Sequence, residues 1–508
     1  MKRRDGPWVL AATILGSSMA FIDGTVVNVA LPAILADFHA TMIDAQWVVE
    51  AYALFLAALL LTGGSLGDRL GRRRVFSAGV VVFAAASVGC GLAASVRQLV
   101  AARAFQGVGG ALLVPGSLAI LSASFPASER GRAIGTWSGF TAITAAIGPV
   151  LGGWLIDHLS WRWAFFVNIP LAAAVLGITV WRVPESRDDK EVGPFDSAGA
   201  VLVTLGLGGI VFALIESSEL GWRDPRVLAA LAGGLLSLGA FAVIERSAPN
   251  PMMPLRLFRS RNFTGANVLT LFLYGALASV FFLIPLDLIQ VQGYTAAAAG
   301  AAVLPFILLM FLLSRWSGGL VHRFGARAPL VVGPLVAASG FCLFAVPGVG
   351  GSYWTTFFPA MVVLGLGMAT SVAPLTTTVM SAVDRRHAGI ASGINNAVSR
   401  TAGLLSVAIL SAVLLHAFGK ALDRRLAVVE VSPVARAAID TQRTKLAAIR
   451  LPAETEGPEA ARVRGAIFAS FVSGFRLVML TASGLSVLAA AAAFVWIDGK
   501  VKTPSVER

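Results

Sequence analysis

The chain has 508 residues, of which 56% are hydrophobic and 13% are charged, and its mean hydropathy is +0.79. Soluble domains carry about 25% charged residues, so this composition excludes an ordinary soluble protein. The formal net charge of +13 would suit a nucleic-acid partner, but the basic residues gather in alternate loops, which excludes that partner and indicates orientation in a membrane.

Apolar stretches of about 20 residues, the length at which a helix crosses a bilayer, recur from one end of the chain to the other. We therefore expect an all-α integral membrane protein with fourteen spans. Their expected ranges are 8–31, 45–65, 75–95, 98–122, 133–156, 163–182, 197–215, 227–245, 263–286, 297–316, 328–347, 354–380, 389–417 and 467–497. The region 328–380 carries no charge, and we divide it at the turn-rich segment 347–352.

Lysine and arginine are concentrated in every second loop, for example at 69–74, 130–132, 256–261 and 323–327. Cytoplasmic loops carry such an excess, so the pattern predicts that both termini lie in the cytoplasm. Arginine is much commoner than lysine, which fits a bacterium, and we expect its cytoplasmic (inner) membrane. A long loop near 418–466 then lies on the outer side, since long loops cross largely regardless of charge.

An internal repeat groups the spans. The segment 64–73 has a weaker copy at 318–327, an offset of 254 residues, and each copy follows the second span of its group. Many transporters are built from repeated bundles. We therefore predict an N-terminal six-helix bundle over 1–182, a linker with two extra helices over 183–262, and a C-terminal six-helix bundle over 263–508 that contains the long outer loop.

Five segments carry recognisable motifs in a fixed order. They are Ile22–Pro32, Gly64–Arg74, Arg103–Pro115, Gly139–Gly153 and Trp161–Pro170. Together they resemble the major facilitator superfamily and, within it, the fourteen-helix drug:proton antiporters. The resemblance implies alternating access and export of small amphipathic compounds such as drugs, antibiotics or related metabolites. It also implies that the proton gradient drives export without a bound cofactor, and that partners are the substrate, protons and the bilayer.

Two carboxylates and one cation lie inside predicted spans. Asp23 is in the first, Glu50 in the second and Arg103 in the fourth. A charge near the bilayer centre costs about 2.5–3.5 kcal/mol on insertion scales, so such residues mark functional sites. We predict that they couple proton movement to transport. Two alternatives stay open: a permanent Asp23–Arg103 ion pair that only fixes helices, and a substrate-binding role for Glu50.

The loop after the second span combines glycines with charges at fixed intervals. Its residues are Gly64, Gly67, Asp68, Arg69, Gly71, Arg72 and Arg73. If the resemblance holds, Asp68 and its arginines meet the end of a facing helix in the other half and latch one state of the transporter. A helix N-terminus attracts anions, which gives this contact a physical basis. The alternative is a plain basic cytoplasmic loop, which would not require the glycines.

Glycine and proline interrupt the fifth span at Gly148, Pro149, Gly152 and Gly153. Proline removes a backbone donor and glycine lets helices approach closely, so we expect this segment to close the outer half of a cavity. The remaining candidates for a substrate cavity are polar residues within spans. They are Asn28, Gln106, Asn395, Asn396 and Arg400.

Competing functions remain at this level. A dedicated exporter of one endogenous metabolite, such as an antibiotic or siderophore, shares every feature above, and a flippase or a sensor with a transporter fold is a further alternative. The five histidines show no metal-ligand spacing, and no phosphate loop is present, so we expect neither an enzyme nor a metal site. The outer loop is a candidate surface for a periplasmic adaptor protein.

Overall fold

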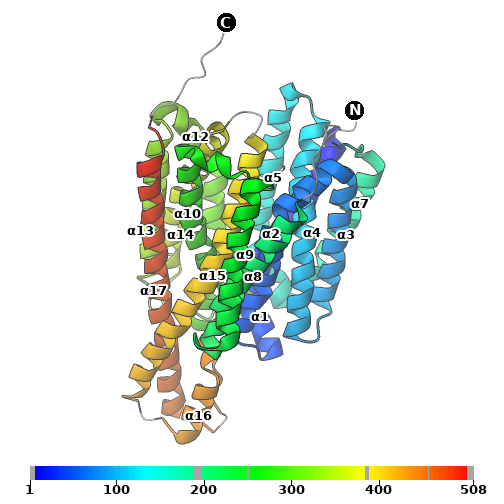
Figure 1. Cartoon of the computed structure of the whole chain (residues 1–508). Coiled ribbons are helices and arrows are strands. Elements are labelled where there is room, and N and C mark those ends of the chain that lie inside the picture. The colour runs from blue at the N-terminus through cyan, green and yellow to red at the C-terminus, as the bar shows by residue number, and fades with distance from the viewer. Residues whose placement is uncertain are drawn as a thin grey trace.

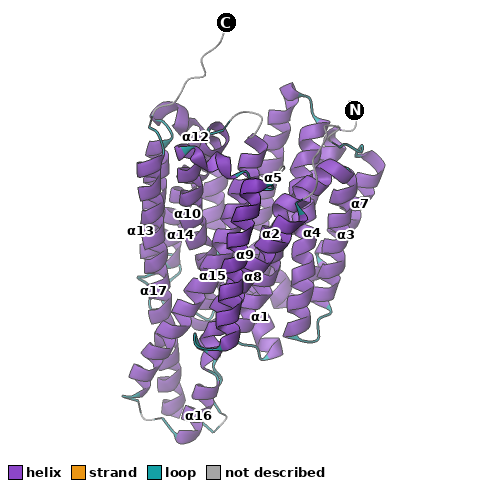
Figure 2. Ribbon diagram, viewed as in Figure 1, coloured by secondary structure: helices purple, strands orange, loops and turns teal. Residues whose placement is uncertain are grey.

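A computed structural model describes residues 6–187, 196–248, 251–383, 388–429, 431–452, 454–455 and 457–499, and this part of the chain contains helices and no strand (Figure 2). The helices are α1 (Gly6–Phe38), α2 (Met42–Leu70), α3 (Arg72–Gly91), α4 (Val96–Ser124), α5 (Ala127–His158), α6 (Trp163–Phe166), α7 (Asn168–Arg182), α8 (Ser197–Leu220), α9 (Pro225–Ser247), η1 (Leu255–Arg259), α10 (Arg261–Leu286), η2 (Asp287–Val291), α11 (Ala296–Ala301), α12 (Leu304–Phe324), α13 (Arg327–Phe344), α14 (Phe357–Ser381), α15 (Ala388–Leu426), α16 (Pro433–Thr441), η4 (Arg443–Ala448) and α17 (Gly457–Trp496).

Thirteen helical stretches of the described chain are long and apolar enough to cross a membrane. Three of them join short neighbours: α6 with α7, α10 with η2, and α11 with the start of α12. The predicted fifth span falls on α5, a helix of 32 residues that packs along α1. With α5, each of the fourteen predicted spans has a helix at its place in the chain.

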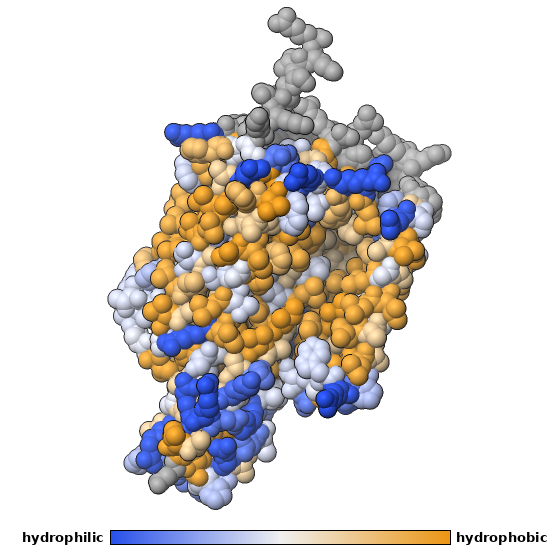
Figure 3. Space-filling view, turned by 60° about the vertical axis from the view of Figure 1, so that its left-hand side comes forward, coloured by the Kyte–Doolittle hydropathy of each residue, from blue (hydrophilic) through white to orange (hydrophobic). Residues whose placement is uncertain are grey.

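The helices run as a bundle with both chain termini at one end and α16 at the other (Figure 1). We call these ends the termini face and the α16 face. Between them the visible surface is a broad apolar belt, with polar residues gathered toward both ends (Figure 3). An apolar belt of this kind suits the hydrocarbon core of a bilayer, because hydrocarbon cannot hydrate polar groups.

The extra pair of helices, α8 and α9, packs as a hairpin through small residues. A Cβ at Gly209 would overlap the α9 backbone at Ala230 and Gly234, so glycine permits the close approach. On its other side α8 contacts both α2 and α15, where Leu54, Val211 and other buried residues form one apolar cluster. The hairpin therefore lies beside the seam between the two larger groups of helices, although the domain limits themselves stay predictions.

The outer loop predicted over 418–466 is shorter than expected. Helix α15 continues to Leu426 and α17 begins at Gly457, so the connection between them covers 427–456 and contains α16 and η4. Buried apolar residues explain the extension, because Leu422, Leu426 and Val463 continue the core of the bundle beyond the predicted span ends. Together these segments form a lobe that projects from the α16 face (Figure 1).

The glycines of α5 bring the two halves together near the α16 face. A Cβ at Gly152 would overlap Val26 of α1, and a Cβ at Gly153 would overlap the backbone of α11 at Ala296 and Ala297. From the other side, a Cβ at Gly300 would overlap the carbonyl of Pro149. Gly148 lies beside α1 as well. The motif in the fifth span thus builds backbone contact between the halves.

We expect Gly153→Val to destabilise the protein by about 1–3 kcal/mol, because the new side chain must displace the α11 backbone. Thermal unfolding of the purified protein in detergent measures the effect. Gly177→Val is the matched control, since a Cβ at that helical glycine meets nothing within 4 Å. Equal unfolding temperatures for the two variants would contradict the close contact.

Candidate functional site

Asp23 of α1 and Arg103 of α4 form an ion pair inside the first group of helices. Arg103 Nη1 lies 2.5 Å from Asp23 Oδ2, and the two side chains are 1% and 0% exposed. The sequence placed each residue within a span and left their ion pair open as one alternative, and the structure contains that pair. Because both are sealed from solvent, each charge depends on its protein partners for the solvation that water would supply.

Three uncharged side chains complete the cluster. Gln106 accepts from Arg103 Nη1 at 2.6 Å and donates to Asp23 Oδ1 at 2.7 Å and to Ser87 Oγ at 2.9 Å. Asn168 Nδ2 lies 3.5 Å from Asp23 Oδ1 and 3.4 Å from Ser87 Oγ. Both carboxylate oxygens therefore have donors, which is the condition for keeping a buried carboxylate charged.

The sequence suggested that Gln106 lines a substrate cavity, whereas the structure places its side chain inside the buried cluster. It is fully buried, because one helical turn separates it from Arg103 and places both side chains on the same face of α4. Ser87 on α3 and Asn168 at the start of α7 were not singled out as polar partners. Ser87 gives only the signal of a polar side chain within an apolar stretch, which is common for serine, whereas Asn168 lies within the motif segment Trp161–Pro170.

Arg103 also links α4 to α2. Its Nε donates to the carbonyl of Val48 at 3.0 Å, and its guanidinium lies 4.3 Å from the ring centroid of Tyr52. Small residues permit this approach, since a Cβ at Gly107 would overlap the carbonyl of Tyr52. A shift in the Asp23–Arg103 pair would therefore act directly on α2 as well as on α1.

Glu50 is also buried, but its surroundings differ. It is 1% exposed, and neither carboxylate oxygen has a hydrogen-bond partner in the described part of the chain. Gln46, one turn earlier on α2, is 0% exposed and its amide is likewise without a partner there. A buried carboxylate without donors is far less costly as the neutral acid, so Glu50 is suited to carrying a proton in this conformation.

The other polar candidates do not join the cluster. Asn395 donates to Asn267 and Thr270 of α10, and Asn28 and Asn396 each reach a carbonyl one turn back on their own helices. Arg400 is half-buried on α15, and α15 packs against α2, the helix whose Tyr52 contacts Arg103.

The segment 64–73, expected to be a loop, forms the end of α2, a turn at Gly71 and the start of α3, and it is held within its own half. Arg72 donates to Asp68, with Nη2 2.8 Å from Oδ1, and the backbone N–H of Arg72 donates to the carbonyl of Ser186. Gly71 adopts φ 105°, a conformation that favours glycine, and the turn brings the N–H of Arg73 to Glu185 at 3.0 Å.

The remaining residues of the segment 64–73 lie close to the turn at Gly71. Gly64 packs against Pro115 of α4, and Gly67 packs against Arg72. Arg69, near the end of α2, is part-buried. The contact of Asp68 with the facing half stays a prediction, and residues 384–387 of that half lie outside the described residues.

Within the described residues, no group of three or more His, Cys, Asp or Glu side chains could hold a metal ion. The site is thus a buried ion pair with polar support, beside a second buried acid on α2.

Known proteins resemble this chain in sequence over most of its length. The model of the Major Facilitator Superfamily matches residues 13–407. The tetracenomycin C resistance and export protein of Streptomyces glaucescens is 34% identical over 96% of this chain and 91% of its own length. The multidrug resistance protein Stp of Mycobacterium tuberculosis is 36% identical over 84% of this chain and 79% of its own length.

A solved structure shares the fold. The crystal structure of a bacterial homologue of the human lysosomal transporter Spinster, in an inward-facing and unoccupied conformation, superposes with a TM-score of 0.68 at 19% identity and covers 97% of each chain. The fold, the family match and the similarity to resistance and export proteins agree: the chain belongs to the Major Facilitator Superfamily.

Proposed function

We propose that this protein is a proton-coupled antiporter that exports small amphipathic compounds across a bacterial cytoplasmic membrane by alternating access. The observation that carries the coupling is the buried Asp23–Arg103 pair, which joins α1, α4 and α2 through direct hydrogen bonds. The names of the relatives support export of drugs or antibiotics. Charge in the basic loops supports a cytoplasmic termini face.

The proposed coupling uses one carboxyl group in two roles. Protonated Asp23 no longer holds the guanidinium by charge, so Arg103 can turn toward another partner. Deprotonation restores the pair and its hydrogen bonds to Gln106. Because Arg103 also binds the Val48 carbonyl, each change is passed to α2, which packs against α8 and α15 at the seam.

The conformation fits an inward-facing state. Near the α16 face, α5 and α11 are in backbone contact, and the carboxylate of Asp157 accepts the N–H groups of Ala296 and Ala297 at 3.1 and 2.8 Å. On the termini face, Asp68 in the last turn of α2 binds Arg72 at the start of α3, within the same half. We infer that the outer side is closed here and that the latch of the opposite state is released.

One resistance experiment tests export and its energy source together. A pump-deficient bacterium expressing the chain should tolerate amphipathic antibiotics at higher concentrations than the empty host, and a protonophore should remove that advantage. The breadth of the profile separates a multidrug exporter from an exporter of one product, which the similarity to the tetracenomycin protein favours as the second candidate. Resistance that persists without a proton gradient would reject antiport.

Asp23→Asn should nearly abolish substrate-driven proton movement in proteoliposomes, because the amide cannot bind and release a proton. Glu50→Gln, made separately, should weaken it if the buried acid carries the second or alternative proton. Both replacements are close in size, and thermal unfolding of each variant confirms that the fold is kept. Undiminished coupling in both variants would remove these carboxylates from the mechanism.

Asp68→Asn should slow transport several-fold and leave substrate affinity unchanged, because Asp68 lies in the last turn of α2 and not among the buried polar groups. Turnover in proteoliposomes and equilibrium binding in detergent measure the two quantities separately. Asp224→Asn is a control that removes one carboxylate from a loop at the α16 face, where Asp224 caps α9. Unchanged turnover for Asp68→Asn would count against the latch.

A further inference from the structure

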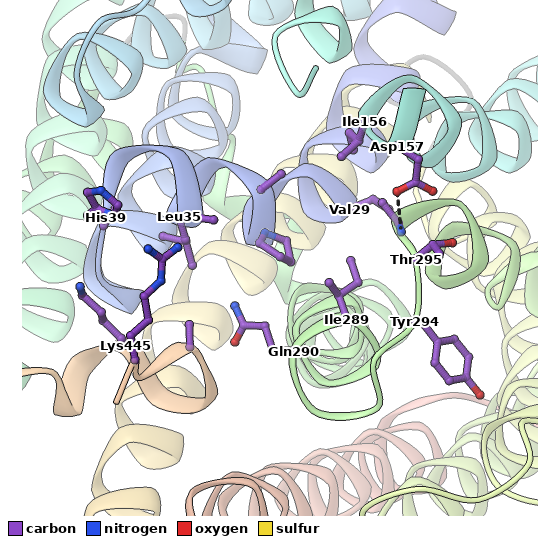
Figure 4. A pocket seen from close by; sticks show the side chains of 17 residues that line it. Val29, Leu35, His39, Ile156, Asp157, Ile289, Gln290, Tyr294, Thr295 and Lys445 are labelled. Atoms are coloured by element: carbon purple, nitrogen blue, oxygen red, sulfur yellow. Dashed lines mark hydrogen bonds between the residues drawn. The ribbon is translucent and has the colours of Figure 1, made fainter. Parts of the chain in front are cut away.

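A cavity of about 370 Å³ opens near the α16 face, away from the buried ion pair (Figure 4). Its walls come from the ends of α1 and α5 in the first half, from η2 and α11 in the second half, and from η4 of the lobe. Ligand pockets in proteins have volumes of about 300–1,000 Å³, so this cavity can hold a small molecule.

Three basic side chains line the cavity: His39, Lys445 and Arg450. His39 and Lys445 lie on the same side of the pocket (Figure 4). Within the described chain, neither Lys445 nor Arg450 makes an ion pair, and no hydrogen bond engages their charged groups or the His39 ring. The positive charge at this end of the pocket is therefore available to a ligand.

The nearby carboxylates of Asp157 and Asp37 bind partners other than the three basic groups. Asp157 faces the other side of the pocket, and both of its oxygens accept backbone N–H groups of α11. Asp37, two residues before His39, binds Arg162 and the indole of Trp161 at 3.0 Å each. Asp287 does not line the pocket; its Oδ2 accepts from Gln292, and its Oδ1 has no hydrogen-bond partner in the described chain. Within the described chain, none of these acids forms an ion pair with the three basic groups.

The rest of the lining is largely apolar. Val29, Pro32 and Leu35 of α1, Ile156 of α5 and Ile289 of η2 contribute apolar surface to the lining. Apolar walls exclude water and strengthen the field of charges placed at their edge. A ligand that matches this surface carries a negative group at one end and an apolar body at the other.

The backbone is strained at the same place. In the described chain, the non-glycine residues with positive φ are His39, at 52°, and Leu446, at 53°. His39 lines the cavity, and Leu446 lies between the lining residues Lys445 and Ala448 in η4. Side chains rarely adopt this conformation, and strained residues cluster at ligand clamps and switch regions. Both strained points therefore mark the positive side of the pocket.

We propose that this pocket binds a small amphipathic anion, with its acid group at His39, Lys445 and Arg450 and its apolar body against α1 and η2. The walls belong to both halves of the protein and to the lobe, which favours a free small molecule over the headgroup of a lipid in the surrounding belt. The proposal does not depend on proton coupling or on the direction of transport.

Two isosteric probes of opposite charge test it. The full chain in phosphatidylcholine nanodiscs is titrated with 2-naphthoate and with 2-naphthylmethylammonium by calorimetry, and empty discs correct for partition into lipid. We expect saturable binding of 2-naphthoate at least about tenfold tighter than binding of the ammonium probe. No binding above empty discs, or equal affinity for the two probes, would overturn the proposal.

Substitutions locate the site. Lys445→Gln with Arg450→Gln should weaken 2-naphthoate binding by about tenfold or more, whereas Lys445→Arg with Arg450→Lys should largely retain it. Lys420→Gln with Arg424→Gln is the matched control, because these exposed residues of α15 lie outside the pocket lining. An equal loss in the control pair would refute the assignment.

A further titration distinguishes a lipid headgroup from a free small molecule as the occupant of the pocket. Discs that contain phosphatidylglycerol should leave the affinity for 2-naphthoate unchanged once empty discs of the same composition are subtracted. Competition by that lipid would assign the pocket to a headgroup and overturn the proposal. Because binding is measured without a gradient or a transport substrate, its failure and the failure of proton-driven export are separate results.

Discussion

The arrangement of the first half depends on keeping two opposite charges inside a membrane. A lone charge near the bilayer centre costs about 2.5–3.5 kcal/mol on insertion scales, and a paired charge still needs its remaining hydrogen bonds satisfied. Asp23 and Arg103 meet both conditions through Gln106, Asn168 and the Val48 carbonyl. This requirement fixes α1, α2, α4 and α7 around one point, and the glycines of α4 allow the approach.

Helix α2 connects the ion pair of the first half to the second half. Its carbonyl at Val48 binds Arg103, while Leu54 on the same helix packs against α8 and α15. Tyr52 of α2 stacks on the guanidinium of Arg103, and α2 also packs against α15, which carries Arg400. One helix therefore connects the ion pair to the seam, and in the proposed coupling this helix would transmit a change in protonation to the bundles.

Much of this was accessible from sequence, for identifiable reasons. Hydrophobic length located the spans, because the bilayer imposes the same length on each. Asp23 and Arg103 stood out because charges in spans are rare. The role of Gln106 and the contacts of Asn168 and Ser87 were not predictable, since they join residues 19 to 145 positions apart whose polar character is ordinary. The extension of α15 and α17 was missed because their apolar contacts lie beyond the expected span ends.

At the α16 face, the seam between the halves contains both a backbone contact and the outer pocket. Backbone contact between α5 and α11 and the walls of the outer pocket are built from the same two segments, together with α1 and η4. A movement that separates Gly153 from Ala296 must also separate the pocket walls, since Ala296 belongs to both. Any ligand held there would consequently bind the closed and open conformations with different affinities. By linkage, its binding would shift the balance between those conformations by the same factor.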